Sequence, residues 1–234
     1  MTNKTLARAW PLALLVALTV VAGAARAQVA PRAEEVGRYA GLLAASHRGD
    51  LGQVKKLLNE GANLNARDDF GRTAVHIAAH ARQRDALRAL ARAGANLELL
   101  ENDRYDAVTI ASVADDEETL RLLLALGASA KLTTSRYDGT ALIAAAHLGH
   151  DGVVRQLIAA GAPLDHVNNL HWTALIEAIV LGNGGVRHQQ VVQALLAAGA
   201  STRLTDREGN TPLALAKARG YAAMISLLEK AGAR

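Results

Sequence analysis

The sequence predicts an all-α repeat solenoid. The prediction rests on two short sequence features that recur at the same interval along the chain. The first landmark is a Gly-Ala pair that recurs six times from residue 61 onward, with its glycines at positions 61, 94, 127, 161, 199 and 232. The intervals between these glycines are 33, 33, 34, 38 and 33 residues. Self-similarity at a fixed period near 33 is typical of helical repeat arrays. The architecture is therefore predicted to be about six stacked repeats, including the terminal caps.

Each Gly-Ala pair follows an apolar run with helical spacing. The apolar positions recur three and four residues apart, which places them on one face of a helix. They are Val54, Leu57 and Leu58; Leu87 and Leu90; Leu120, Leu123 and Leu124; Val154, Leu157 and Ile158; Val192, Leu195 and Leu196; and Ile225 and Leu228. Glycine is the residue expected just past a helix C-terminus, where the backbone turns left-handed. The pairs therefore predict helix ends.

A second landmark predicts helix starts. A residue that can cap a helix precedes an apolar run at Thr73, Asp106, Thr140, Thr173 and Thr211. Pro212 then occupies a first-turn position, where its missing N–H is not needed. Each repeat is thus predicted to hold two helices and a connecting segment.

These repeats resemble ankyrin repeats. The resemblance is carried by helix starts such as Thr211-Pro-Leu-Ala214, Gly-His or Gly-Asp turns between helices, and endings such as Gly61-Ala-Asn-Leu-Asn-Ala66. It covers residues 38–234 and implies a helix-turn-helix with a β-hairpin loop in each repeat. The repeats are expected at about 38–72, 73–105, 106–139, 140–172, 173–210 and 211–234, within a single domain.

The N-terminus reads as a secretory signal peptide. Lys4 and Arg8 precede an apolar stretch, and Ala25-Arg-Ala27 matches an Ala-x-Ala cleavage site. We expect cleavage between Ala27 and Gln28, export to the periplasm, and a flexible lead-in over residues 28–37. No membrane association is expected after cleavage.

Composition excludes several functions. The sequence has no cysteine, so it forms no disulfide and has no thiolate chemistry. Removing residues 1–27 leaves 26 − 3 = 23 basic and 22 acidic residues, and no basic stripe suited to nucleic acid. We therefore expect a monomer that binds a folded protein and no nucleic acid.

The ankyrin resemblance places one set of side chains on an exposed concave face. Aromatic residues and arginine are enriched in protein interfaces, and four of the six aromatic residues of the mature chain fall in the predicted hairpins. The predicted protein-binding residues are Arg67, Asp69, Phe70, Arg72, Asp103, Tyr105, Arg136, Tyr137, Asn169, Trp172 and Arg207. The alternative is that the hairpins use these side chains to pack on one another.

The 38-residue interval contains an insertion at residues 181–188, between the helices of the fifth repeat. Nearby, Glu177 takes a helix position that is apolar in other repeats, so its carboxylate is expected to point inward and accept hydrogen bonds from Gly182–Gly185. Gly182, Gly184 and Gly185 are the predicted loop-pinning partners. His171 stands where the hairpin pattern has glycine, and a non-glycine residue resists positive φ.

Residues 168–185 also resemble a subgroup of exported bacterial ankyrin proteins. Some members of that group are linked with oxidative-stress defence beside catalases, so the resemblance implies support of an exported enzyme such as a catalase. A toxin-neutralising immunity protein is the alternative within the same class of interaction modules.

An enzyme is the competing class, with Glu177 and His188 as an acid/base pair. No nucleophile, oxyanion motif or second carboxylate accompanies Glu177 at a recognisable spacing, so we assign no catalytic residue. His76 and His80 lie four apart on one helix, yet Ile77 stands where a zinc protease motif has glutamate. We expect no metal and no cofactor.

Overall fold

The computed structural model describes residues 30–234, which form thirteen helices joined by turns and hairpin-shaped loops. The predicted all-α repeat solenoid is confirmed. The predicted signal peptide and the first two residues of the lead-in lie outside the described residues. Within the described part, every helix is too short or too polar to cross a membrane.

Twelve of the helices form six pairs, one in each repeat. In chain order the pairs are α2 (Gly41–Arg48) with α3 (Leu51–Asn59), α4 (Ala74–His80) with α5 (Arg84–Arg92), α6 (Ala107–Val113) with α7 (Glu117–Ala125), α8 (Ala141–Leu148) with α9 (Asp151–Ala159), α10 (Ala174–Val180) with α11 (Val186–Ala197), and α12 (Pro212–Ala218) with α13 (Ala222–Lys230).

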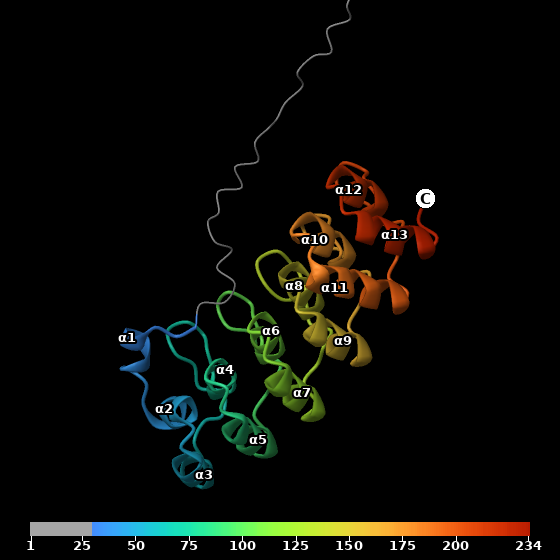
Figure 1. Ribbon diagram of the computed structural model, residues 1–234. Coiled ribbons are helices and arrows are strands. Elements are labelled where there is room, and N and C mark those ends of the chain that lie inside the picture. Colours follow the sequence, from blue (N-terminus) through green and yellow to red (C-terminus); the bar gives the residue numbers. More distant parts are fainter. Residues whose placement is uncertain (1–29) are drawn as a thin grey trace, which may run out of the picture.

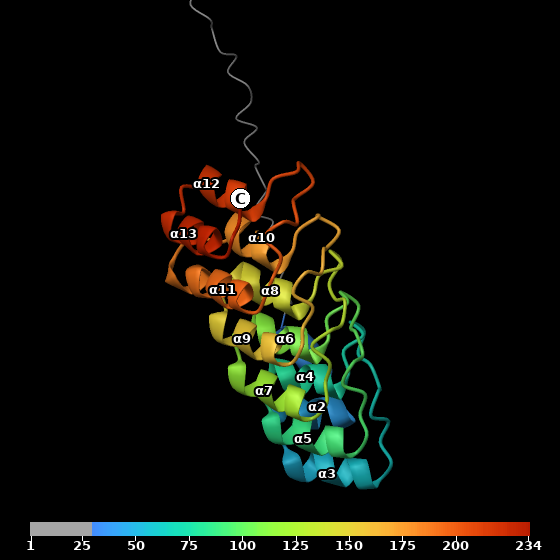
Figure 2. The same cartoon turned by 90° about the vertical axis from the view of Figure 1, so that its right-hand side faces the viewer.

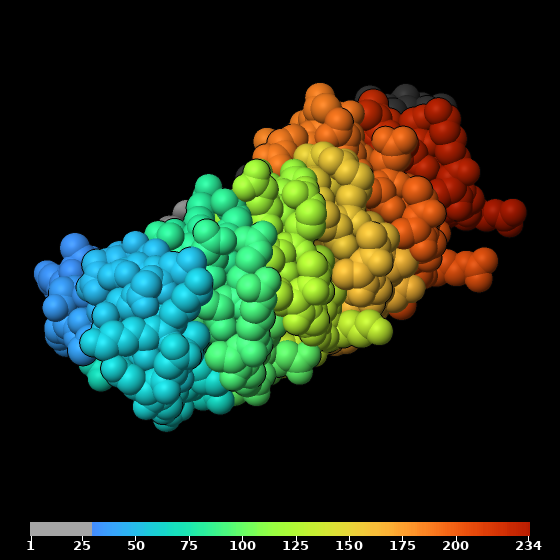
Figure 3. Space-filling view, turned by 90° about the horizontal axis from the view of Figure 1, so that it is seen from below, coloured from blue at the N-terminus to red at the C-terminus, as the bar shows by residue number. Residues whose placement is uncertain are grey.

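The pairs stack into an elongated body. Figure 1 shows the first helices of the pairs in one row, from α2 to α12, and the second helices in a parallel row, from α3 to α13. The hairpin-shaped loops all project toward the same side (Figure 2). In the space-filling view the repeats follow one another as bands from blue to red (Figure 3). Each repeat therefore contacts mainly its neighbours, as expected of a solenoid.

Local sequence sets the helix ends. The Thr140, Thr173 and Thr211 hydroxyls and the Asp106 carboxylate each accept a hydrogen bond from the backbone N–H three residues later, which satisfies a donor left free at a helix start. All six glycines of the Gly-Ala pairs have positive φ, between 79° and 94°. The predicted helix stops are thus confirmed.

The core is one continuous apolar cluster that runs through all six pairs. Leu90, Leu123, Leu157 and Leu195, at equivalent positions of successive second helices, are each fully buried. The first helix of each pair packs against the first helices of the neighbouring repeats. Side chains on these helices, such as Ile176 on α10, are therefore buried as well. Burial of this kind stabilises by about 25 cal/mol per Å² of apolar surface.

The connecting loops have the shape of hairpins but almost no strand pairing. Within residues 30–234, the single β-bridge joins Thr134 and Gly139. We refer to residues 67–72, 101–105, 134–139, 168–172 and 206–210, which form the loop tips, as the hairpin edge.

The lead-in differs from expectation. Residues Ala33–Val36 form a one-turn helix, α1, and Glu35 on it is only 5% exposed. Glu35 forms ion pairs with Arg32, at 2.5 Å, and with Arg72 of the first hairpin, at 2.6 Å. Arg72 lies 37 residues from Glu35 in the sequence. The residue spacing within the lead-in therefore could not predict this contact.

Candidate functional site

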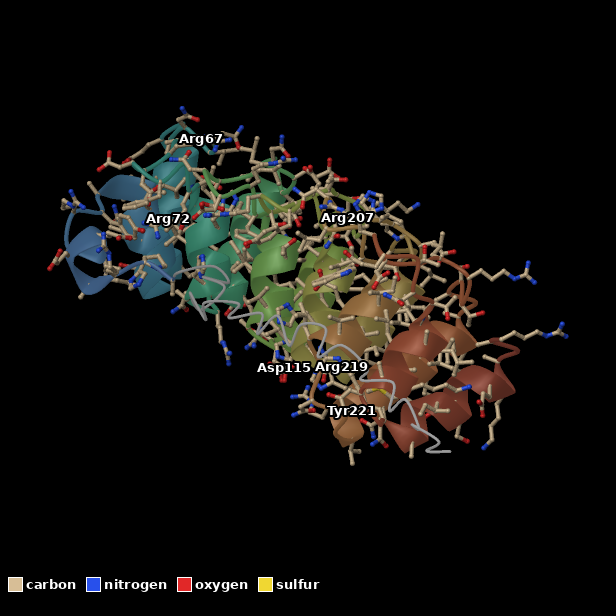
Figure 4. The ribbon with its side chains drawn as sticks, turned by 90° about the horizontal axis from the view of Figure 1, so that it is seen from above. Arg67, Arg72, Asp115, Arg207, Arg219 and Tyr221 are labelled. Carbon is tan, nitrogen blue, oxygen red and sulfur yellow. The ribbon has the colours of Figure 1, made fainter. Side chains whose placement is uncertain are left out.

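Side chains and backbone join the loops of the hairpin edge into one strip. Arg67 lies at one end and Arg207 near the other (Figure 4). Backbone N–H groups of Asn102, Ser135 and Asn169 each donate to a carbonyl of the preceding hairpin, at 2.9–3.0 Å. Because each hairpin holds the next in register, the edge is a continuous surface.

Two predicted binding residues take part in this cross-linking. The Arg67 guanidinium donates to the carbonyls of Gly71 and Leu100, at 2.7 and 2.8 Å. The Arg207 guanidinium donates to the Asn169 carbonyl at 2.8 Å. Both arginines thus have a structural role on the edge, and both residues are exposed.

Four of the hairpins use the same internal hydrogen bonds. In each of these hairpins, a side-chain oxygen of the residue four positions before the hairpin's last residue accepts hydrogen bonds from the backbone N–H groups two and four residues later. These bonds close a tight turn. In the first hairpin Asp68 accepts from Phe70 and Arg72 at 2.9 and 2.8 Å. Glu101, Asn168 and Asp206 do the same in their hairpins.

The next-to-last residue of each of the five hairpins has positive φ. These residues are Gly71, Arg104, Asp138, His171 and Gly209, with φ of 75°, 66°, 51°, 65° and 82°. His171 therefore keeps the turn that glycine would make, as Arg104 and Asp138 do. The backbone N–H of each of these non-glycine residues donates to the carbonyl three residues earlier in the same hairpin. These bonds hold the residues in the left-handed region, at a cost of about 1 kcal/mol each.

Arg72 is not available to a partner, which corrects the prediction for this residue. It is 4% exposed, and its guanidinium bonds Glu35 and Asp68 at 2.6 and 2.7 Å. The guanidinium carbon also lies 4.5 Å from the centre of the Phe70 ring. Sequence reasoning assigned Arg72 to the surface because the hairpin position is usually exposed, whereas α1 covers it here.

Some of the hairpin aromatic residues pack within the protein, and one is accessible to a partner. Phe70, Tyr105 and Trp172 are half-buried, and Tyr105 packs against the apolar core. Tyr137 is 44% exposed. Local packing therefore accounts for a good part of the aromatic enrichment in the first hairpins, while Tyr137 stays accessible.

Exposed apolar side chains lie in the third and fourth hairpins and directly before the fourth. Tyr137, Val167 and Leu170 are 44%, 42% and 37% exposed. The Asn169 N–H donates to the Tyr137 carbonyl at 2.9 Å, so these hairpins are adjacent. We call Tyr137, Val167 and Leu170 the central apolar patch.

Charged residues border the central apolar patch. Arg136 pairs with Asp103 at 3.1 Å, and Arg104 pairs with Asp138 at 2.8 Å. Arg136 and Asp103 are 67% and 58% exposed, and Asp69, farther along the edge, is 85% exposed. An apolar centre with a polar rim is the anatomy of protein interfaces.

A groove of about 480 Å³ lies beneath the first hairpins. Its walls combine hairpin side chains such as Phe70, Tyr105 and Arg136 with helix side chains such as His80 and Ile110. Arg32 and Glu35 of the lead-in form part of the wall. The groove therefore extends the edge onto the row of first helices.

Glu177 does not pin the glycine-rich loop, which corrects a second prediction. The carboxylate is 5% exposed, and its Oε1 accepts a hydrogen bond from the Asn168 side-chain amide at 2.8 Å. Within residues 30–234 it accepts none from the amides of Gly182–Gly185. Burial raises the pKa of Glu177 to about 7, with the Asn168 bond opposing the shift.

Other side chains hold the loop. The Tyr221 hydroxyl donates to the Gly182 carbonyl at 2.9 Å, and the Gln189 amide donates to the Gly184 carbonyl at 2.8 Å. The His188 ring bonds the His147 carbonyl at 2.9 Å. A Cβ at Gly184 would lie 2.7 Å from the Tyr221 ring, so glycine makes room for that ring.

Arg187 ties the inserted segment to earlier repeats, a role that sequence reasoning missed. Its guanidinium bonds Asp115 of the third repeat at 2.9 Å and Asp151 of the fourth at 3.1 Å. Figure 4 shows Asp115 and Tyr221 on the edge opposite the hairpins. The sequence signal was a basic residue within an insertion, but its partners lie 36 and 72 residues away.

Glu177 and His188 are engaged separately rather than with each other. The His188 imidazole bonds Asn183 and the His147 carbonyl, whereas Glu177 bonds Asn168. Acid/base catalysis needs both groups within reach of one substrate in an open site. The geometry does not favour the enzyme alternative.

His76 is a structural histidine. Its Nδ1 accepts the Thr73 N–H at 3.1 Å, which leaves Nε2 to donate to the Tyr105 carbonyl at 3.1 Å. Burial lowers the pKa of His76 to about 4, so the ring is neutral. In the part of the chain that the structure describes, no three potential metal ligands gather.

The fold and edge together define a helical repeat protein with a continuous loop surface. The family model for ankyrin repeats (3 copies) matches residues 42–134 and 115–206. The chain belongs to the ankyrin repeat family.

Similar proteins span nearly the same length. The chain is 37% identical over 192 residues to the ankyrin repeat protein YahD of Escherichia coli K12, which covers 82% of this chain and 95% of YahD. It is 44% identical to a crystal structure of an ankyrin repeat domain from Acinetobacter baumannii, with a TM-score of 0.78, covering 82% of this chain and 98% of that one.

A third neighbour comes from a complex of two proteins. It is a chain in the structure of a predatory endopeptidase from Bdellovibrio bacteriovorus in complex with an immunity protein. The identity is 25% and the TM-score 0.68, with 82% of this chain and 98% of that chain covered.

Proposed function

We propose that this protein is exported to the periplasm and binds a folded partner protein through the hairpin edge. Ankyrin repeats are protein-interaction modules in general and not enzymes. The observation that carries the choice of surface is the central apolar patch, exposed and bordered by charged pairs. Export rests on the Lys4/Arg8 region and the Ala25-Arg-Ala27 motif alone.

Binding at this edge requires little ordering of the chain. The hairpins are already tied to one another by backbone hydrogen bonds, so few side chains lose freedom when a partner docks. A rigid edge suits a partner with a fixed, folded surface better than a flexible peptide.

The partner has two candidate identities. The resemblance of residues 168–185 to exported ankyrin proteins implies support of an oxidative-stress enzyme such as a catalase. The second candidate is inhibition of a periplasmic toxin or hydrolase, and the observation favouring it is the neighbour found in a complex of an endopeptidase with an immunity protein.

A capture experiment with matched variants tests the proposal. The mature chain, residues 28–234, is immobilised and incubated with periplasmic extract, beside a Tyr137→Ala/Leu170→Ala variant. The control is Leu148→Ala/Val186→Ala, which removes side chains of 36% and 67% exposure outside the hairpin edge. We expect a protein that the parent and the control retain and the hairpin variant loses at least tenfold.

The activity of the captured protein then separates the two candidates. An enzyme whose half-life increases when bound indicates support, whereas an enzyme whose turnover stops indicates inhibition. Equal retention by both double variants would contradict the hairpin edge as the binding surface.

A further inference from the structure

The first helix of the fifth repeat carries a buried carboxylate directly beneath the hairpin at residues 168–172. Glu177 lies nine residues after Asn168, the residue that starts the hairpin. The residues nine positions after Asp68, Glu101 and Asp206 are the apolar Ile77, Ile110 and Leu215. The fifth repeat therefore places an ionisable group where these three repeats place a hydrocarbon side chain.

Asn168 connects this carboxylate to the shape of the hairpin. Its Oδ1 accepts the N–H groups of Leu170 and Trp172, both at 3.0 Å. Its amide nitrogen donates to Glu177 at 2.8 Å. One amide group thus holds the turn with its oxygen and the carboxyl group with its nitrogen, so a change at Glu177 is transmitted to the turn.

Few charged groups face Glu177 from the helices packed on α10. The titratable group on α8 is His147, whose Nδ1 lies 3.6 Å from Glu177 Oε2. On α11, His188 bonds the His147 carbonyl. On α12, Lys217 instead pairs with Glu229 at 3.2 Å. The hairpin contributes the uncharged Asn168 and, next to it, the exposed imidazole of His171.

His147 does not supply a compensating cation at neutral pH. Burial lowers the pKa of His147, and the neighbouring His188 and His150 lower it further. Among residues 30–234, the carboxyl group consequently has one uncharged hydrogen-bond donor and no arginine or lysine partner. A buried carboxyl group in such surroundings favours its protonated form.

We propose that Glu177 gains and loses a proton within the folded protein and that hairpin 168–172 changes its shape or mobility in response. When the carboxyl group is ionised, the Asn168 amide donates a charge-assisted hydrogen bond, which is stronger than a neutral one. When it is protonated, the same bond is weaker and the turn is held less tightly. Leu170 of the central apolar patch lies on this turn.

Trp172 provides a direct optical readout, since Trp10, the second tryptophan of the sequence, lies in the predicted signal peptide. Fluorescence of the mature chain, residues 28–234, is measured from pH 5 to 9. The expected result is a change with a midpoint near pH 7, where the Glu177 pKa lies. The midpoint is expected to vanish in Glu177→Gln, and its persistence there would overturn the inference.

Two histidine variants exclude a different origin of the signal. His171→Gln removes the exposed ring next to Trp172, and His147→Gln removes the ring nearest to Glu177. A midpoint near pH 7 that survives in both variants supports Glu177 as the titrating group. Loss of the change in His171→Gln would assign it to that imidazole and overturn the inference.

Backbone amide NMR of the unaltered protein avoids dependence on the folding of any variant. The N–H signals of Leu170 and Trp172 are expected to shift with the Glu177 midpoint. Those of Glu208 and Asn210, bonded to Asp206 above the apolar Leu215, are the internal control. Equal shifts in both hairpins, or none in hairpin 168–172, would contradict the inference.

The consequence for binding rests on the proposed function. Suppose that the Tyr137→Ala/Leu170→Ala variant no longer binds the partner. The dissociation constant of the partner from the parent protein is then expected to differ between pH 6 and pH 8, and that from Glu177→Gln is expected to stay the same. If that double variant keeps the partner, the proposed function fails while the titration of hairpin 168–172 stands on the optical and NMR results.

Discussion

The first and fourth hairpins, residues 67–72 and 168–172, share a backbone design and differ in how they treat buried charge. Glu35, against the first hairpin, and Glu177, beneath the fourth, are each 5% exposed. Two ion-pair partners, Arg72 and Arg32, hold the pKa of Glu35 down to about 2 against the opposing effect of burial. Burial without a cation raises the pKa of Glu177 to about 7. Two carboxyl groups of equal exposure thus have opposite pKa shifts: ion-pair partners lower the pKa of Glu35, and burial without a cation raises the pKa of Glu177.

The difference traces to two aligned positions. Asp68 and Arg72 of the first hairpin correspond, 100 residues later, to Asn168 and Trp172. The first hairpin has a carboxylate and the cation that neutralises it, while the fourth has an uncharged amide and an aromatic ring. Removing or exchanging these groups tests whether the comparison is correct.

The largest effect is expected from Arg72→Met. The change leaves Glu35 and Asp68 as buried carboxylates without their shared cation, and breaking a buried ion pair from one side costs about 4 kcal/mol. Urea unfolding of residues 28–234 at pH 7 measures it. Arg136→Met, which removes an exposed pair, is the control and should cost less than about 1 kcal/mol. Similar losses of unfolding free energy for both variants would show that the buried ion pairs of Arg72 contribute no more to stability than an exposed pair.

The next effect is expected from Glu177→Gln, and it depends on pH. The folded pKa of Glu177 is raised from 4.5 to about 7, so the folded protein binds this proton more tightly than the unfolded chain. Stability from this group is full below pH 4.5 and is lost as pH rises through about 7. At about 1.4 kcal/mol per pKa unit, the loss approaches about 3 kcal/mol at pH 8.

Glutamine has no proton to lose, so Glu177→Gln should be more stable than the parent at pH 8 and differ little at pH 5. Urea unfolding at the two pH values checks this. Glu35→Gln is the counterpart with the opposite sign, since the lowered pKa of Glu35 adds stability above about pH 4.5 that is lost as pH falls toward 2. A pH-independent difference for Glu177→Gln would show that the carboxyl group does not titrate there.

A smaller effect is expected from Asn168→Asp, which gives the fourth hairpin the acid of the first hairpin without the neighbouring cation. The change removes the donor to Glu177 and places a second carboxyl group beside it, at a cost of about 2 kcal/mol at pH 8. At pH 5 the two groups can share a proton, so the cost should shrink. Thermal unfolding at both pH values measures the difference.

Adding the missing cation sharpens this test. In Asn168→Asp/Trp172→Arg, the new guanidinium occupies the position of Arg72 and should recover part of the loss at pH 8. No recovery would mean that the lead-in helix, present only at the first hairpin, is needed to bury such a pair.

The smallest effect is expected from His171→Gly. Gly71 and His171 occupy the same turn position, with φ of 75° and 65°. Relief of the left-handed strain at a non-glycine residue should stabilise the protein by about 0.5 kcal/mol, after the entropy cost of glycine. The midpoint of thermal unfolding reports the change, and a lower midpoint would show that the His171 side chain contributes contacts to the hairpin.

The helical part of the fold was largely readable from the sequence. The Gly-Ala pairs, the threonine caps and the apolar spacing act within a single repeat, and local hydrogen bonds then set where each helix begins and ends. The helix stops at Gly61 and its equivalents lie where the sequence predicted them. Of the insertion predicted at residues 181–188 between two helices, residues 186–188 form the start of α11 and only residues 181–185 connect the helices. Patterns with a period near 33 also predict stacking, because an isolated repeat cannot bury its own apolar face.

The accessibility and charge of individual side chains were decided by the tertiary structure. Arg72 is buried because a helix from the lead-in covers it, and Glu177 bonds Asn168 because the hairpin returns over α10. Arg187 reaches acids in two earlier repeats. The sequence by itself determined the elements and their repetition, because those depend on neighbours in the chain. The state of each buried charge depends on groups brought close by folding, which only the assembled structure supplies.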